Sequence, residues 1–140
     1  MSRTTVRLLA LALILTFTLA ACGGSASNSS APRTVTLTMA EFQFQPTEIT
    51  VNVGQPIKLV LNNNGTVLHD FVSTDAMVEV MEEHGAEHDM AGMQTNMHAA
   101  IEAGQQSTLE FKATQPGTYT FYCTIAGHRE AGMEGKLIVK

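Results

Sequence analysis

The sequence has few cysteines, no apolar segment long enough to span a membrane and no excess of basic residues. These absences argue against a disulfide-rich protein, a membrane-spanning helix and a nucleic-acid-binding protein. Its 140 residues include only two cysteines, Cys22 and Cys123, which are too few for a framework of disulfide bonds. Its main apolar run, residues 8–19, is shorter than the roughly 20 residues that a membrane-spanning helix needs. The formal net charge of −5 argues against binding to nucleic acid.

Residues 1–21 have the features of a secretory signal peptide. Arg3 and Arg7 give a positive start, and the apolar run follows them. The run ends in LAAC, closed by Cys22, which resembles the lipobox of bacterial lipoproteins. That resemblance implies cleavage after residue 21 and a lipid attached to Cys22. The alternative is an ordinary signal peptide with a cysteine beside its cleavage site.

The residues after the expected cleavage point indicate a tether followed by one domain. Residues 22–32 are rich in Gly and Ser and lack the apolar content to fold, so the domain is expected at residues 33–140. Two or more acyl chains are enough for stable anchoring to a membrane. We therefore expect a lipid-anchored domain on the extracytoplasmic face of a bacterial membrane, in the periplasm or at the cell surface. Cys123 would then be its only unmodified thiol.

From residue 33 on, apolar and polar residues alternate over short segments that are separated by turn signals. This period of two predicts half-buried strands, six to eight in number. The fold class is therefore predicted to be all-β, a β-sandwich. The expected strands cover residues 34–39 with a continuation through Phe42 and Phe44, then 49–53, 57–61, 69–72, 107–113, 118–123 and 135–140.

Residues 75–100 interrupt this alternation. Met77, Met81, His84 and His88 are separated by four, three and four positions, a spacing that places side chains on one face of a helix. We predict a short helix followed by a loop, inserted between strands.

Three residues of types that bind soft metals recur five positions apart near the C-terminus, namely Cys123, His128 and Met133. They lie between two predicted strands, so one loop could direct all three side chains toward a single point. His69, at the start of another predicted strand, is the candidate for a fourth ligand. Thiolate and thioether sulfur favour Cu(I), and imidazole suits both Cu(I) and Cu(II). A trigonal set of two His and one Cys with a weak Met is the blue-copper arrangement for electron transfer.

These residues give the chain a resemblance to the cupredoxins, especially small bacterial members such as the auracyanins and sulfocyanins. The resemblance covers residues 34–140 and rests on the segments YCTIAGHREAGMEGKLIV, VNVGQPIKLVLNN and VLHDF. It implies a Greek-key β-sandwich with one type 1 copper ion at one pole. His69, Cys123 and His128 would be the strong ligands, and Met133 the weak axial ligand.

The residue after the first histidine departs from the family pattern. Cupredoxins often carry Asn there, and its side chain ties the two ligand loops together, whereas this chain has Asp70. We expect either that the Asp70 carboxylate accepts the same loop amide, near Thr124, or that it is solvated in a turn. In the first case its charge would favour Cu(II) and lower the reduction potential.

A methionine- and histidine-rich segment, residues 77–98, contains five Met and three His. Thioether and imidazole groups suit copper capture, so one interpretation is a second copper site for loading, storage or delivery. The other interpretation is a helix that packs on the sandwich, followed by a mobile acidic loop, because Met commonly fills gaps in packing.

We therefore expect a carrier of single electrons and not an enzyme, because four protein ligands leave no open position for a substrate. Its expected partners are redox proteins of a respiratory or photosynthetic chain, contacted through small residues beside His128 such as Ala126 and Ala131. The carrier is expected to be a monomer that binds no nucleic acid. The alternative function is an extracytoplasmic copper chaperone or storage protein. A copper nitrite reductase or a multicopper oxidase would need a second domain, and a binuclear centre would need a second cysteine in the loop.

Overall fold

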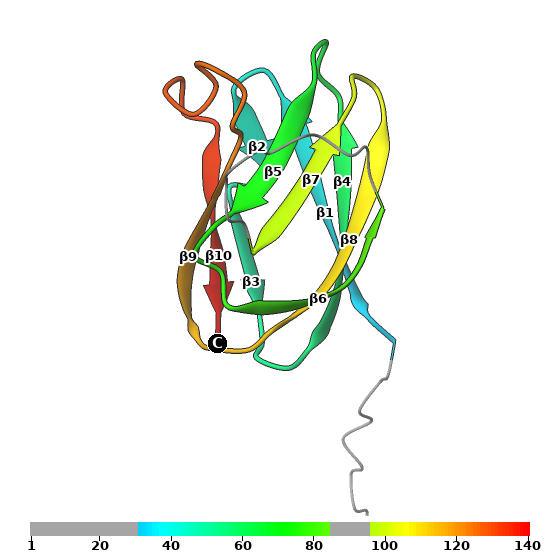
Figure 1. Ribbon diagram of the computed structural model, residues 1–140, viewed down its shortest axis with the longest axis vertical. Helices are drawn as coiled ribbons and strands as arrows, with labels where there is room; N and C mark the ends of the chain where they lie inside the picture. Colours follow the sequence, from blue (N-terminus) through cyan, green and yellow to red (C-terminus); the bar gives the residue numbers. More distant parts are fainter. Residues whose placement is uncertain (1–30, 85–95) are drawn as a thin grey trace, which may run out of the picture.

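The computed structural model describes residues 31–84 and 96–140, which form a β-sandwich of two five-stranded sheets (Figure 1). The expected signal peptide, the lipid site at Cys22 and almost all of the tether lie outside the described residues. Among the residues that are described, no helix is long and apolar enough to cross a membrane.

Most strand pairs in the two sheets are antiparallel, and the pairs β1–β4 and β3–β10 are parallel. The first sheet has the order β2-β1-β4-β8-β6, built from β1 (Arg33–Ala40), β2 (Gln43–Gln45), β4 (Pro56–Asn63), β6 (Val78–His84) and β8 (Gln106–Ala113). The second has the order β3-β10-β9-β5-β7, built from β3 (Glu48–Val51), β5 (His69–Ser73), β7 (Met97–Ile101), β9 (Gly117–Tyr122) and β10 (Glu134–Val139). The predicted all-β sandwich is confirmed, although the described residues contain ten strands where six to eight were predicted.

The alternating residues determine which face of each strand is buried. In β4, Ile57, Leu59 and Leu61 are buried while the residues between them are partly exposed. Phe111 and Leu109 of β8 lie opposite Ile57 and Leu59 in register. Between the sheets, a cluster of edge-to-face and tilted rings joins Phe44, Phe71 and Phe121. Burial of this apolar surface, at about 25 cal/mol per Å², is the main stabilising contribution to the sandwich.

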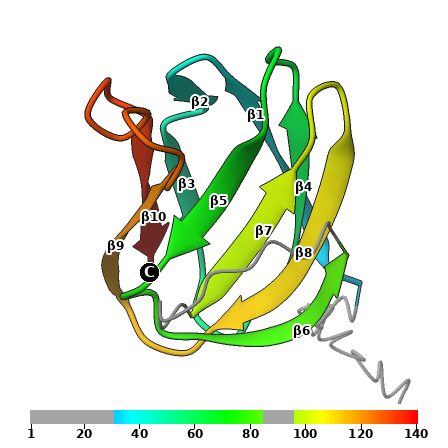
Figure 2. The ribbon, with the colours of Figure 1, turned by 45° about the horizontal axis from the view of Figure 1, so that its top comes forward.

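The two ends of the sandwich differ in what they contain. At one end, Arg33 of β1 lies opposite Ile57 in register, and Val53 N–H, a few residues earlier in the chain than Ile57, donates to the carbonyl of Lys140. The start of β1 and the C-terminus therefore lie at the same end of the sandwich. The loops β4–β5, β7–β8 and β9–β10 lie at the opposite end, at the top of Figures 1 and 2. His69 and Cys123 both belong to that opposite end.

The predicted helix is wrong in its described part. Residues 78–84 form the edge strand β6, which pairs with β8, and His88 lies outside the described residues. The register of β6 shifts between Val80 and Glu82, which marks a β-bulge and breaks the period of two. Strand β7 was not predicted either, since residues 97–100 fall in the segment 75–100, for which a helix followed by a loop is predicted.

Candidate metal centre

Three elements bring the predicted ligands to one end of the sandwich. His69 is the first residue of β5, Cys123 directly follows β9, and the loop from Cys123 to β10 contains His128 and Met133. Because β5 and β9 are neighbours in one sheet, two residues that lie 54 positions apart in the chain become adjacent in space. Sheet pairing, and not proximity in the sequence, therefore assembles the site.

The loop between β9 and β10 is held in shape by its own backbone. His128 N–H donates to the carbonyl of Ile125 at 3.0 Å, and Met133 N–H donates to the carbonyl of His128 at 3.0 Å. Cys123 N–H donates to the carbonyl of Met133 at 3.1 Å, which closes the loop. Gly132 has a φ of 102°, a conformation that favours glycine, so it permits the turn that leads into Met133.

His69, Cys123 and His128 present three donor atoms to one another. The Nδ1 atoms of His69 and His128 lie 3.2 Å apart, and Cys123 Sγ lies 3.5 Å from His128 Nδ1 and 4.0 Å from His69 Nδ1. One donor atom from each residue lies within 4.8 Å of the others, and all three residues are buried. A metal such as zinc binds imidazole nitrogen at about 2.0 Å and thiolate sulfur at about 2.3 Å, so donors that share one ion lie roughly 3–4 Å apart. The three side chains therefore fit a single metal ion.

Met133, the fourth predicted ligand, is fully buried. Its backbone forms hydrogen bonds with the backbone of Cys123 and of His128, and its side chain belongs to the core cluster that also contains Cys123. A weak thioether ligand suits a position that is enclosed and fixed by the loop backbone.

The environment favours neutral imidazole and a thiol that ionises on metal binding. Burial lowers the pKa of His69, and the charge of His128 lowers it further, so the His69 imidazole is available as a ligand. Burial raises the pKa of Cys123 to about 11, while hydrogen bonds from the backbone of Asp70 and Ile125 oppose that rise. Those amides would stabilise a thiolate once a metal replaces the proton.

Asp70 accepts a hydrogen bond from Thr124 N–H at 2.6 Å, and its second oxygen accepts one from the Thr124 hydroxyl. The side chain of Asp70 is fully buried. The expectation that this carboxylate ties the two ligand loops together is confirmed, and the alternative of a solvated side chain is wrong.

Two neighbours of the site were not recognised in the sequence. Phe42 was interpreted as part of a strand, yet it lies in the β1–β2 turn with a φ of 63° and is 46% exposed. Its ring meets His128 edge-on, with centroids 5.2 Å apart. Glu41, the preceding residue, accepts hydrogen bonds from Thr66 in the β4–β5 loop. The signal in the sequence is a shift in the alternation, because the apolar positions are odd-numbered as far as Met39 and even-numbered at Phe42 and Phe44.

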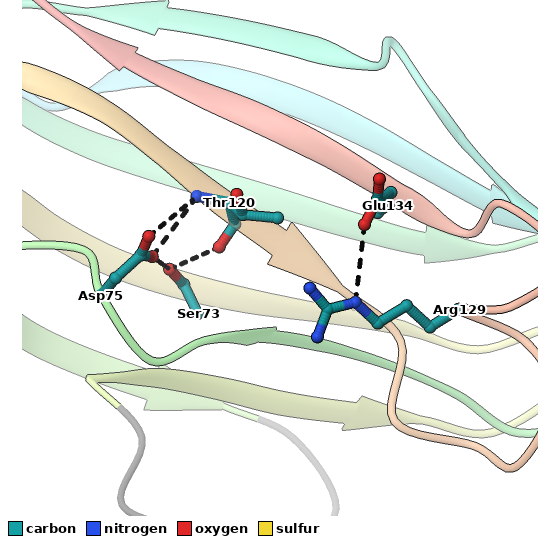
Figure 3. Close-up of polar contacts among 5 residues, drawn as sticks. All are labelled: Ser73, Asp75, Thr120, Arg129 and Glu134. Carbon is teal, nitrogen blue, oxygen red and sulfur yellow. Dashed lines mark hydrogen bonds and ion pairs between the residues drawn. The ribbon is translucent and has the colours of Figure 1, made fainter.

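Figure 3 shows two groups of polar contacts near strands β9 and β10, one of Arg129 with Glu134 and one of Asp75 with its neighbours. The Arg129 guanidinium lies 3.9 Å from the ring centroid of Tyr122 and 3.5 Å from a carboxylate oxygen of Glu134. Farther along β9, Asp75 accepts from the backbone N–H of Thr120. Arg129 thereby links the loop that carries His128 to the two strands that flank it.

A family model described as "Cupredoxin-like domain" matches residues 9–139. Among curated proteins, the chain is 35% identical over 104 residues to the "Copper-resistant cuproprotein CopI" of Rubrivivax gelatinosus, covering 70% of this chain and 60% of that protein. It is 33% identical over 99 residues to the plastocyanin of Dryopteris crassirhizoma, covering 71% of this chain and 89% of that protein. The match to a minor plastocyanin isoform of Arabidopsis thaliana spans 50% of that protein, so the chain corresponds to only part of some relatives.

Solved structures show the same fold. Auracyanin A, a "blue" copper protein from Chloroflexus aurantiacus, superposes with a TM-score of 0.61 at 22% identity, covering 79% of this chain and all of that one. An auracyanin from Roseiflexus castenholzii gives a TM-score of 0.59 at 22% identity, covering 76% of this chain and 96% of that one.

Proposed function

This chain belongs to the cupredoxin-like domain family, and from that membership we propose that it carries single electrons between redox proteins outside the cytoplasm. Its cofactor is one copper ion, which supplies one-electron chemistry when bound. The observation that carries the proposal is the buried convergence of two imidazole Nδ1 atoms and one thiol at one end of the sandwich. We assign His69, Cys123 and His128 as the strong ligands and Met133 as the weak one.

The protein's own residues would perform three tasks in this function. The sheet pairing and the closed loop keep the donor atoms in place, so little reorganisation accompanies a change of charge at the site. Burial excludes water and small substrates, which favours electron transfer over catalysis. His128 is 8% exposed, so it is the ligand that reaches nearest to a partner's surface.

Surface residues around His128 support a small, transient contact with a partner. Ala126 and Ala131 are exposed on either side of it, and Phe42 adds an exposed aromatic edge. Weak electron-transfer complexes need only a small interface. The partners would be redox proteins of a respiratory or photosynthetic chain, and the carrier would act as a monomer.

We propose a lipid anchor at Cys22, and the arrangement of the two ends would suit it. Strand β1 begins at Arg33, at the end of the sandwich opposite to the candidate site (Figure 1). A tether at residues 22–32 would therefore attach to the membrane from the far end and leave the metal end free to meet a partner. The predicted signal peptide and lipid anchor would place the domain on the extracytoplasmic face, in the periplasm or at the cell surface.

A reductive titration of the copper-loaded protein tests the electron-carrier proposal. We expect one reversible one-electron transition per chain, followed by optical absorption and electrochemistry. A protein that instead loses its copper on each reduction, or shows no reversible couple, would be no electron carrier.

A second candidate function is copper handling, as a chaperone or storage protein. The similarity to a relative named as copper-resistant supports it, as do the exposed side chains of Met77 and Met81. Metal counting tests the second site: more than one bound copper per wild-type chain would support it, and a Cys123→Ser variant that retains no copper would exclude it.

A further inference from the structure

His69 has a second ring nitrogen that the candidate metal site does not use. Its Nδ1 atom faces Cys123 and His128, so metal binding there leaves the proton on Nε2. Nε2 is buried and has no hydrogen-bond partner among the described residues. A histidine that binds a metal nearly always donates its other N–H to a carboxylate, a carbonyl or a water molecule, and this fixes the ring and its tautomer.

Gly65 lies beside His69 Nε2 and beside two oxygen acceptors. A Cβ atom at this glycine would stand 2.8 Å from His69 Nε2, 2.8 Å from Glu41 Oε1 and 3.1 Å from Asn63 Oδ1. The imidazole N–H and two oxygen acceptors therefore surround one small space that only glycine leaves open. Asn63 Oδ1 already accepts from Gly65 N–H, and the Asn63 amide donates to the carbonyls of Val67 and Ile101. The Asn63 side chain thus forms its hydrogen bonds with the backbone, and Glu41 is the charged one of the two acceptors.

The Glu41 carboxylate is fixed by the loop that precedes His69. Its Oε1 atom accepts from Thr66 N–H at 2.5 Å and from the Thr66 hydroxyl at 2.9 Å. These hydrogen bonds lower the pKa of Glu41 to about 2, so the group is a constant negative charge in neutral solution. Thr66 uses two of about four acceptor positions on the carboxylate, so the group can also accept from the imidazole side through one water.

We propose that Glu41 is a positioning residue for His69, the carboxylate that faces its Nε2–H across Gly65 and holds the imidazole with Nδ1 toward copper. This role rests on the proposed copper site. A negative charge on this side of the ring strengthens His69 as a ligand and stabilises Cu(II) over Cu(I), which lowers the reduction potential. The carboxylate belongs to the β1–β2 turn, so it couples a third loop to a site built from β5 and the β9–β10 loop.

Glu41→Gln tests this role, because glutamine keeps an acceptor for Thr66 and removes the charge. The matched control is Glu79→Gln, which makes the same change in β6, at the end of the sandwich away from the candidate site. There Glu79 lies opposite Lys112 of β8 in the strand register. We expect Glu41→Gln to favour reduction by a factor of about three or more, roughly 30 mV for a one-electron couple, and the control to change it by less. In the Cu(I) protein, NMR should show a shifted and faster-exchanging His69 Nε2–H signal in Glu41→Gln only.

A second variant tests whether the position of the Glu41 carboxylate matters as well as its charge. Thr66→Val keeps the charge of Glu41 but removes the hydroxyl that holds it, so it should shift the potential in the same direction by a smaller amount. Thermal melts of the apo variants confirm that they fold. Equal potentials in Glu41→Gln and Glu79→Gln, with an unchanged Nε2–H signal, would overturn the role of Glu41 and leave the copper site intact. A wild-type protein that binds no copper would overturn both proposals.

Discussion

Asp70 accepts two hydrogen bonds from Thr124, one from its backbone N–H at 2.6 Å and one from its hydroxyl, and so joins the residue after His69 to the residue after Cys123. Replacing Asp70 with Asn keeps an acceptor and removes a charge near copper. We expect a higher reduction potential with little loss of stability. Replacing it with Ala leaves the Thr124 donors unpaired and should lower the free energy of unfolding by about 1–3 kcal/mol. Electrochemistry and urea denaturation measure the two effects, and an unchanged potential in Asp70→Asn would count against a tuning role.

Phe42 combines a strained backbone with an exposed contact to His128. Glycine adopts its φ of 63° without strain, so Phe42→Gly should not lower the stability of the apo protein. The loss of the ring should slow electron self-exchange severalfold, because the aromatic edge beside His128 is missing from the contact. NMR line broadening in mixtures of oxidised and reduced protein measures this rate. A self-exchange rate equal to that of the wild type would remove Phe42 from the electron-transfer surface.

The Cys123 thiol makes the stability of the apo protein depend on pH. Its pKa is raised from 9.0 to about 11 by burial, so above pH 9 the unfolded chain ionises while the folded chain does not. This contribution to stability is complete below pH 9 and is lost as the pH rises through about 11, for a total of roughly 2–3 kcal/mol. Comparing wild type with Cys123→Ser by urea denaturation cancels the other titrating groups. The difference between the two proteins should shrink across this window, and a constant difference would show that the thiol is not perturbed.

The absence of a side chain at Gly135 in β10 leaves room for the ring of Phe121 in the core. A Cβ atom there would lie 2.4 Å from the Phe121 ring and 2.6 Å from the carbonyl oxygen of Thr47, so Gly135→Ala forces the ring or the backbone to move. We expect the free energy of unfolding to fall by roughly 1–3 kcal/mol. Adding Phe121→Leu should make the two effects less than additive, since the smaller side chain relieves the clash. Strictly additive effects would mean that the ring is not the obstacle.

Much of this architecture could be predicted because it depends on local patterns. Period-two alternation identified most strands, and the spacing of Cys123, His128 and Met133 within one loop between strands indicated a metal site. The link between Asp70 and Thr124 was one of two alternatives, and it came from the resemblance to the cupredoxins, in which an Asn at this position ties the ligand loops together.

Features that depend on tertiary contacts could not be predicted. Met77 and Met81 have a spacing that fits a helix, yet pairing with β8 and a bulge after Val80 make residues 78–84 an edge strand. Glu41 lies near His69 because the β1–β2 turn packs against the β4–β5 loop. The hydrogen bond between these two segments joins Glu41 to Thr66, which lie 25 residues apart in the chain. No local pattern records such a contact.

The most direct test of the account is the visible absorption and EPR spectrum of the protein loaded with Cu(II), beside a Cys123→Ser variant. We expect one copper per chain and an intense thiolate-to-Cu(II) band in the wild type, and no such band in the variant. An oxidised, copper-loaded wild type that stays colourless, or a band that survives the loss of the Cys123 sulfur, would contradict it.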